Sequence, residues 1–305
     1  MRAITLRRPS VAIPAIVLLA IACVEVTPAA SQFGTVAAQA FHSFVSTSRH
    51  PGEMGIGGVI FVALALFLAG VVSGLAGFAF SAVAACIVWL LPPLQAVPLV
   101  MLLSACNQLL SMGKLRQEMT LRTTAQREGA LPYIIGGVAG VPIGVELLRT
   151  LPAHLFSAGL GAFLVAYALL MLLLPSALRI RLSGPKAAAA VGALGGVAGG
   201  FSGFGASVLI VYLGLRGVGK SETRGITQPY IFTMQLASLG VLAITASSIF
   251  NIFFWFMWAM TLPAVLLGSV TGVALYRRLN DTNFRRAVLI LLVVSGASLL
   301  AKAVV

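Results

Sequence analysis

The chain has 305 residues, of which 59% are hydrophobic and only 9% are charged. Average soluble domains carry roughly 25% charged residues, so this composition excludes a water-soluble protein and predicts membrane-spanning segments. The net charge of +13 does not indicate nucleic-acid binding, because the lysines and arginines form short clusters between apolar stretches and no single basic face or tail.

The N-terminus resembles a secretory targeting segment. Three arginines precede an apolar run over residues 11–24, and small residues follow it. A cleaved signal peptide and an uncleaved signal anchor both fit residues 1–30, and we favour the anchor. Either one places residue 31 outside the cytoplasm. Apolar residues then recur at helical spacing over residues 31–52, which predicts an interfacial amphipathic segment.

An internal repeat organises the remainder of the chain. GVVSGLAGFAFS at 70–81 aligns with GVAGGFSGFGAS at 196–207, at an offset of 126 residues and with six identical positions. Two further blocks follow in the same order at offsets of 127 and 128. Three blocks in one order indicate a duplication. We therefore predict transmembrane repeat 1 over 53–176 and transmembrane repeat 2 over 177–305.

Each repeat is predicted to hold one long glycine-interrupted stretch and three ordinary spans. These are 57–91, 94–112, 130–149 and 153–175 in the first repeat, and 187–215, 225–246, 250–276 and 284–304 in the second. If every stretch crossed the bilayer once, two of the four basic loops would lie outside the cytoplasm, against the positive-inside rule. If each glycine-interrupted stretch leaves on the side it entered, all four basic loops are cytoplasmic.

The fold class that follows is an all-α polytopic membrane protein with two inverted-topology repeats. Each repeat is a glycine-broken re-entrant helical hairpin plus three transmembrane helices. The N-terminus is then cytoplasmic and the C-terminus periplasmic, in a multi-pass protein of a bacterial inner membrane. A homo-oligomer is compatible with the sequence.

The two glycine-rich turns form the candidate anion site. A turn inside the membrane favours glycine, and the helix that starts after it presents unpaired N–H groups and the positive end of its dipole. Nearby serines add hydroxyl groups. Glycines three or four residues apart also let membrane helices pack closely, which remains an alternative here. The candidate substrate-binding residues are Ser73, Gly74, Gly77, Ser81, Gly200, Ser202, Gly203, Gly205 and Ser207.

Amide side chains within apolar segments extend this set. A buried amide is costly in lipid, so these side chains face the protein interior, where they either bond other helices or contact the substrate. An arginine that opens the segment of Gln235 either supplies a cation to the anion or anchors the segment at the interface. The residues are Asn107, Gln108, Gln228, Gln235 and Arg224.

Enzymatic and metal chemistry are not predicted. The spans contain no GxSxG, HExxH or paired aspartates, and the scattered cysteines and histidines lack the spacing of metal ligands. We therefore expect no catalytic residue, no metal and no cofactor. No carboxylate lies near the middle of a span, so no proton relay is expected either.

The motifs GxxSGxxGF at 70–78 and GxxGGxSGFG at 196–205 resemble the sulfite exporter TauE/SafE family, over about residues 57–304. The resemblance implies a transporter that exports sulfite or an organosulfonate by alternating access, with a small anion and the lipid bilayer as its partners. The residues that match the motif are Gly74, Gly77, Gly200, Gly203 and Gly205.

The chain departs from the family pattern in ways that suggest a divergent branch. Ala79 and Phe80 stand in one half, and Ala206 in the other, where the family commonly shows consecutive glycines. Two other functions stay open: import of a sulfur compound or small carboxylate, and a non-transporting membrane scaffold.

Overall fold

The computed structural model describes residues 56–76, 79–122, 129–173, 184–276 and 281–304, all within one compact unit. These residues form ten α-helices and two short 3-10 helices, and they contain no strand. The predicted all-α class is therefore confirmed for the described chain. The targeting segment and the interfacial segment predicted over residues 1–52 lie outside the described residues.

The helices follow the predicted spans closely. The first half contains α3 (Ile56–Ala76), α4 (Phe80–Ala84), η1 (Ala85–Trp89), α5 (Pro93–Arg122), α6 (Leu131–Thr150) and α7 (Ala153–Leu173). The second half contains α8 (Pro185–Ser202), α9 (Ala206–Leu215), α10 (Lys220–Thr245), η2 (Ser247–Ile249), α11 (Ile252–Tyr276) and α12 (Asp281–Val304). α5 continues well beyond the predicted end at residue 112, because the polar residues that follow still favour helix although they end the apolar span.

Three helices of the described chain have the length and the apolar composition of membrane spans. Leu131–Thr150, Ala153–Leu172 and Ile252–Leu275 are long and apolar enough to cross a bilayer. Twenty helical residues extend for about 30 Å, which matches the hydrocarbon thickness. Together with several shorter apolar helices, they support a multi-pass membrane protein.

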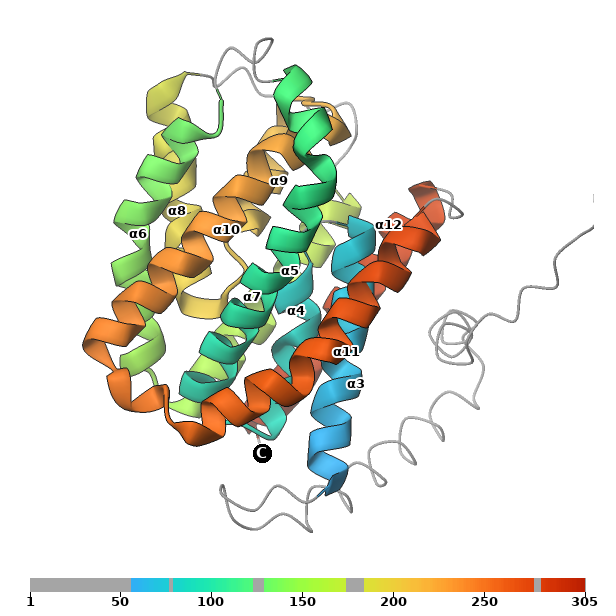
Figure 1. Cartoon of the computed structure of the whole chain (residues 1–305). Helices are drawn as coiled ribbons and strands as arrows, with labels where there is room; N and C mark the ends of the chain where they lie inside the picture. Colours follow the sequence, from blue (N-terminus) through green and yellow to red (C-terminus); the bar gives the residue numbers. More distant parts are fainter. Residues whose placement is uncertain (1–55, 77–78, 123–128, 174–183, 277–280, 305) are drawn as a thin grey trace, which may run out of the picture. The chain divides into compact units, whose positions relative to one another are not determined.

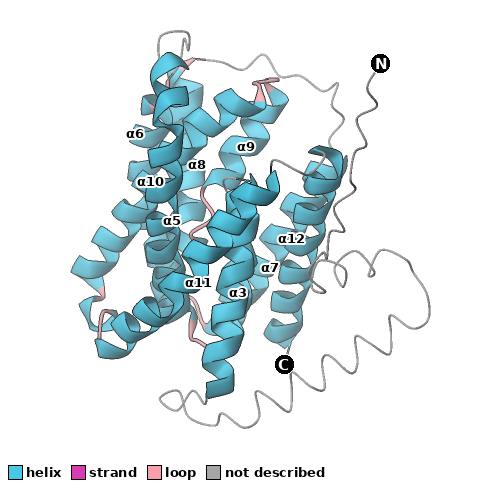
Figure 2. Cartoon of the chain, turned by 45° about the vertical axis from the view of Figure 1, so that its right-hand side comes forward, coloured by secondary structure: helices cyan, strands magenta, loops and turns pink. Residues whose placement is uncertain are grey.

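Helices of the first half pack against helices of the second half (Figure 1). α3, the first helix of the first half, packs along α11, and α8, the first helix of the second half, packs along α6. α7 packs against α12, as Figure 2 also shows, and α5 packs against α10. The main neighbour of each of these helices therefore belongs to the other half.

Matching glycines make the contact of α3 with α11 and the contact of α6 with α8. A β-carbon on Gly272 of α11 would lie 2.1 Å from the carbonyl oxygen of Val71 in α3. A β-carbon on Gly144 of α6 would lie 2.1 Å from the carbonyl oxygen of Val197 in α8. Only glycine permits backbones to approach this closely. Gly144 and Gly272 correspond across the repeat, as do Val71 and Val197, so equivalent residues make equivalent contacts.

The glycine-interrupted stretch of the second half breaks at Gly203. Its φ of 74° lies in the left-handed region, which ends α8 and which glycine adopts at little cost. The amide of Gly203 still donates to the carbonyl of Gly199 at 2.7 Å. α9 then packs back against α8, and a β-carbon on Gly205 would lie 2.6 Å from the carbonyl oxygen of Gly195.

The corresponding stretch of the first half is also broken. α3 ends at Ala76 and α4 begins at Phe80, and the two helices contact each other. Residues 77–78 lie outside the described part, so nothing is placed for Gly77. In Figure 1, α3 and α5 both begin at the bottom, whereas α8 and α10 both begin at the top. The two broken stretches thus start from opposite ends of the bundle.

Candidate functional site between the two helix breaks

The two helix breaks meet inside the bundle. A β-carbon on Gly203 would lie 3.2 Å from the hydroxyl oxygen of Ser81 and 3.4 Å from Cγ of Met101. Ser81 lies on α4, directly after the first break, and Gly203 forms the second break. Residues about 120 positions apart in the sequence therefore come into contact, and both were predicted as site residues.

A small cavity lies beside this contact. Ser81 and Ser202 provide its polar lining, and apolar residues of α4, η1, α5 and α7 complete it: Ala84, Ala85, Ile87, Val88, Ala96, Val97, Val100 and Leu160. Its volume is about 10 Å³. That volume accommodates about one water molecule. The cavity is thus too small for a polyatomic anion in this conformation.

Serine hydroxyls of the second half fix the shape of the break. Ser202 Oγ donates to the carbonyl oxygen of Ala198 at 2.8 Å and accepts from the amide of Phe204 at 3.3 Å. Ser207 Oγ donates to the carbonyl oxygen of Phe204 at 2.8 Å. The bond from the amide of Phe204 satisfies a donor that the interrupted helix leaves without a partner, whereas the bond to Ala198 is the usual back-bond of a helical serine to the carbonyl four residues before it. The hydroxyl hydrogens of Ser202 and Ser207 are therefore engaged with the backbone.

Buried polar side chains lie along α5, next to the break. Asn107 Nδ2 donates to Ser73 Oγ at 2.8 Å and joins α5 to α3. Gln235 Nε2 donates to Ser104 Oγ at 2.6 Å and joins α10 to α5. Ser104 follows Met101 by three residues, so the cluster begins one helical turn from the contact with Gly203. The structure thus brings three predicted residues, Ser73, Asn107 and Gln235, close to the break.

Two amides on α10 have an unused polar atom. Gln235 Oε1 accepts no hydrogen bond, and Gln228 Nε2 donates none, among the described residues. Both side chains are at most 2% exposed. Residues seven apart share one helix face, and Arg224, half-buried and four residues before Gln228, lies on that face too. Because buried polar atoms nearly always have partners, these atoms are available to a water or a ligand.

Two predicted glycines have a packing role. A β-carbon on Gly74 would lie 2.5 Å from the carbonyl oxygen of Ser269, and one on Gly200 would lie 2.5 Å from that of Val141. These contacts support the alternative of close helix packing at both positions. Gln108 is buried on α5. Substrate contact at Gly74, Gly200 and Gln108 stays a prediction.

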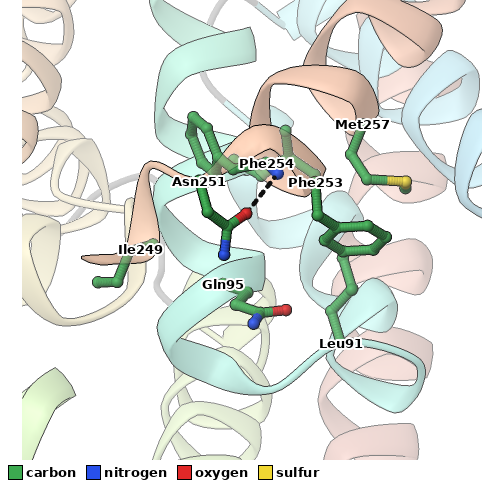
Figure 3. Close-up of a pocket in the computed structure, with 8 residues that line it drawn as sticks. Leu91, Gln95, Ile249, Asn251, Phe253, Phe254 and Met257 are labelled. Atoms are coloured by element: carbon green, nitrogen blue, oxygen red, sulfur yellow. Dashed lines mark hydrogen bonds between the residues drawn. The ribbon is translucent and has the colours of Figure 1, made fainter. Parts of the chain in front are cut away.

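A second small cavity lies where α5 and α11 begin (Figure 3). Leu91, Gln95, Leu99, Ile249, Asn251, Phe253, Phe254 and Met257 line it. Asn251 Oδ1 accepts a hydrogen bond from the amide of Phe254 at 3.0 Å, and this bond caps the first turn of α11. None of these residues was predicted as a site residue.

Ser104 was not predicted either. A serine in an apolar helix carries no sequence signal of its own, because serine commonly bonds back to its own helix in membranes. Its role depends on the approach of α10, which brings Gln235 to Ser104. The two residues are 131 positions apart in the sequence.

Comparison with known proteins adds a family. The family model described as "Sulfite exporter TauE/SafE" matches residues 62–299. This range includes both helix breaks and every residue of the polar cluster on α5 and α10. No curated protein and no solved structure matches the chain.

Proposed function

Because the chain belongs to the sulfite exporter TauE/SafE family, a family of membrane transporters and not of enzymes, we propose that it exports a small anion across the bilayer. The substrate is sulfite or an organosulfonate. The observation that carries this proposal is the contact between Ser81 and Gly203, because it puts two interrupted helices and a polar cluster at one place inside an apolar bundle.

The chemistry of this place suits a negative charge. α9 starts directly after the second break, so its first amides and the positive end of its dipole face the region of the break. The hydroxyl of Ser81 lines the cavity, and Gln228 Nε2 has an unused donor on the neighbouring helix α10. Donors and a dipole bind an anion in a low-dielectric interior more strongly than they would in water.

Transport by alternating access requires the cavity to open. In the described conformation the space beside Ser81 and Ser202 holds about one water, so this conformation is occluded. The packing of α3 with α11 and of α8 with α6 joins the two halves, which supports two inverted-topology repeats that move against each other. Broken stretches that begin at opposite ends support one re-entrant hairpin from each face of the bilayer.

The orientation we propose follows from charge. Lys186, Arg216 and Arg224 lie where α8 begins, α9 ends and α10 begins, and this end is placed in the cytoplasm by the positive-inside rule. With the signal anchor predicted over residues 1–30, the N-terminus is cytoplasmic, and the C-terminus is periplasmic, in a bacterial inner membrane. A potential that is negative inside drives an anion outward by about 2.3 kcal/mol per charge per 100 mV, without a proton relay.

Efflux from proteoliposomes tests this proposal. Vesicles that contain the purified chain are loaded with sulfite, taurine or sulfoacetate, and release is followed with and without an imposed potential, against protein-free vesicles. We expect release of sulfite or sulfoacetate, faster when the lumen is negative. Taurine is a zwitterion of zero net charge, so any release of taurine should not respond to the potential.

Two results would overturn parts of the proposal. Equal release from protein-containing and protein-free vesicles for all three compounds would remove the sulfonate assignment. Uptake into empty vesicles without any release from loaded ones would identify an importer.

A further inference from the structure

Lys302, in the last turn of α12, contacts the end of η1, the short helix that follows α4 after the first break. Its ammonium group donates a hydrogen bond to the backbone carbonyl of Val88 and lies 5.8 Å from the centroid of the Trp89 ring. Trp89 Nε1 donates in turn to Ser298 Oγ at 2.8 Å. The end of η1 is therefore joined to α12 at three points.

Local helix chemistry explains why this contact forms. Carbonyls at the end of a helix have no partner within that helix, and a cation is favoured at its negative end. Lys302 places its positive charge at the C-terminal end of α12, because it lies in the last turn of that helix. It also donates to a carbonyl at the end of η1. The ring of Trp89 adds a cation–π contact.

Among the described residues, Lys302 has no carboxylate partner. An ion pair between two described residues is that of Arg149 with Glu146, at 2.7 Å. Lys302 is half-buried. An ammonium removed from water is costly unless an opposite charge accompanies it. Among the described residues, its local contacts therefore leave a positive charge without a counter-ion.

This charge adjoins the cavity at the two breaks. Val88, whose carbonyl accepts from Lys302, lines the cavity together with Ser81 and Ser202. α12 also contacts α4, on which Ser81 lies. An anion that moved from the cavity along η1 toward the end of α12 would thus meet the ammonium of Lys302.

The second half has a comparable feature at the opposite end. α9, the helix that follows the second break, ends next to Arg216, whose guanidinium carbon lies 5.6 Å from the centroid of the Tyr212 ring. Each helix that returns from a break therefore ends with a cation over an aromatic ring. α9 ends at the top of Figure 1, whereas α12 and the C-terminus end at the bottom.

We propose that Lys302 is a substrate-binding residue that receives the anion when it leaves the cavity toward the end of α12. This inference rests on the proposed function. In the absence of an anion, the carbonyl of Val88 and the ring of Trp89 hold the ammonium. An arriving oxyanion displaces the carbonyl, because a hydrogen bond between two ionised groups is roughly twice as strong as one to a neutral acceptor.

Chemical restoration of the charge tests the proposal. In a chain with Cys23, Cys86 and Cys106 replaced by alanine, Lys302→Cys is made, and labelling is verified by intact mass. A 2-aminoethyl methanethiosulfonate adduct restores an ammonium at nearly the length of lysine. A methyl methanethiosulfonate adduct is neutral. We expect Lys302→Cys to raise the KM for efflux about tenfold, and the aminoethyl adduct alone to return it to within about twofold of the parent value.

Lys186→Met is the matched control, because it removes one positive charge from an exposed position at the start of α8. It should leave KM unchanged. A neutral adduct that restores KM as well as the charged one would overturn the proposal, as would equal effects of Lys186→Met and Lys302→Cys. Efflux by the parent chain separates this inference from the proposed function. If the parent transports and Lys302→Cys has the parent KM, only the role of Lys302 fails.

Discussion

Gly272 of α11 lies directly against the backbone of Val71 in α3, with 2.1 Å between a constructed β-carbon and the carbonyl oxygen. This contact holds the helix that leads to the first break. We predict that Gly272→Ala destabilises the protein by about 1–3 kcal/mol, because the methyl group forces the two helices apart. The measurement is the apparent melting temperature of the protein purified in detergent.

Gly240→Ala provides the control for this prediction. Gly240 is exposed on α10, and a β-carbon there would have no atom within 4 Å. Alanine is the better helix former, so this variant should melt at the parent temperature or slightly above it. Equal melting of the two variants would show that the contact at Gly272 is not needed.

Gly203→Ala is expected to slow efflux. Its φ of 74° costs an L-residue about 1–2 kcal/mol, and the new methyl group would lie 3.2 Å from Ser81 Oγ. Ser81→Ala in the same chain should recover only part of the melting temperature, because the backbone strain remains. Gly214→Ala is the control, since this exposed glycine has no atom within 4 Å of its constructed β-carbon. Parent-like efflux and melting by Gly203→Ala would contradict the prediction.

Gln235 and Ser104 should differ in their effect on substrate affinity. Gln235→Met removes both polar atoms of the amide, including Oε1, which accepts no bond among the described residues. Ser104→Ala removes only the partner of Nε2. We expect Gln235→Met to raise the KM for efflux several-fold and Ser104→Ala to change it less than twofold. Changes in melting temperature without any change in KM would indicate a purely structural bond between the two helices.

Labelling of single cysteines checks the proposed orientation. Gly219, before α10, and Ser248, between α10 and α11, are both exposed and lie at opposite ends of α10. In the cysteine-free chain, a membrane-impermeant maleimide added to intact cells should label Ser248→Cys and spare Gly219→Cys. Inverted membrane vesicles should give the opposite pattern. Labelling of Gly219→Cys from outside intact cells, with Ser248→Cys spared, would refute the two-hairpin topology.

The place where the second glycine-interrupted stretch breaks could be predicted from the sequence, because a break depends on local chemistry. The repeat alignment pointed to Gly203, and α8 ends at Ser202. The corresponding prediction at Gly77 lies outside the described residues. The family resemblance is confirmed by the match over residues 62–299. These predictions required only residue types and their spacing.

The partner of each residue could not be predicted in the same way. Gly74 and Gly200 have the same local sequence features as Gly203, yet their contacts are with the backbones of α11 and α6. Ser104 and Lys302 gain importance only through α10 and η1, which approach them from distant parts of the sequence. A pattern read along one segment carries no information about which segment lies opposite.

The small volume of the cavity beside Ser81 and Ser202 has a consequence for the membrane voltage. A voltage is maintained only if no file of water runs uninterrupted from one face of the bilayer to the other, since protons and salt would follow it. A space that admits about one water between Ser81 and Ser202 interrupts such a file at this point. In this conformation protons and salt therefore find no continuous file of water past Ser81 and Ser202.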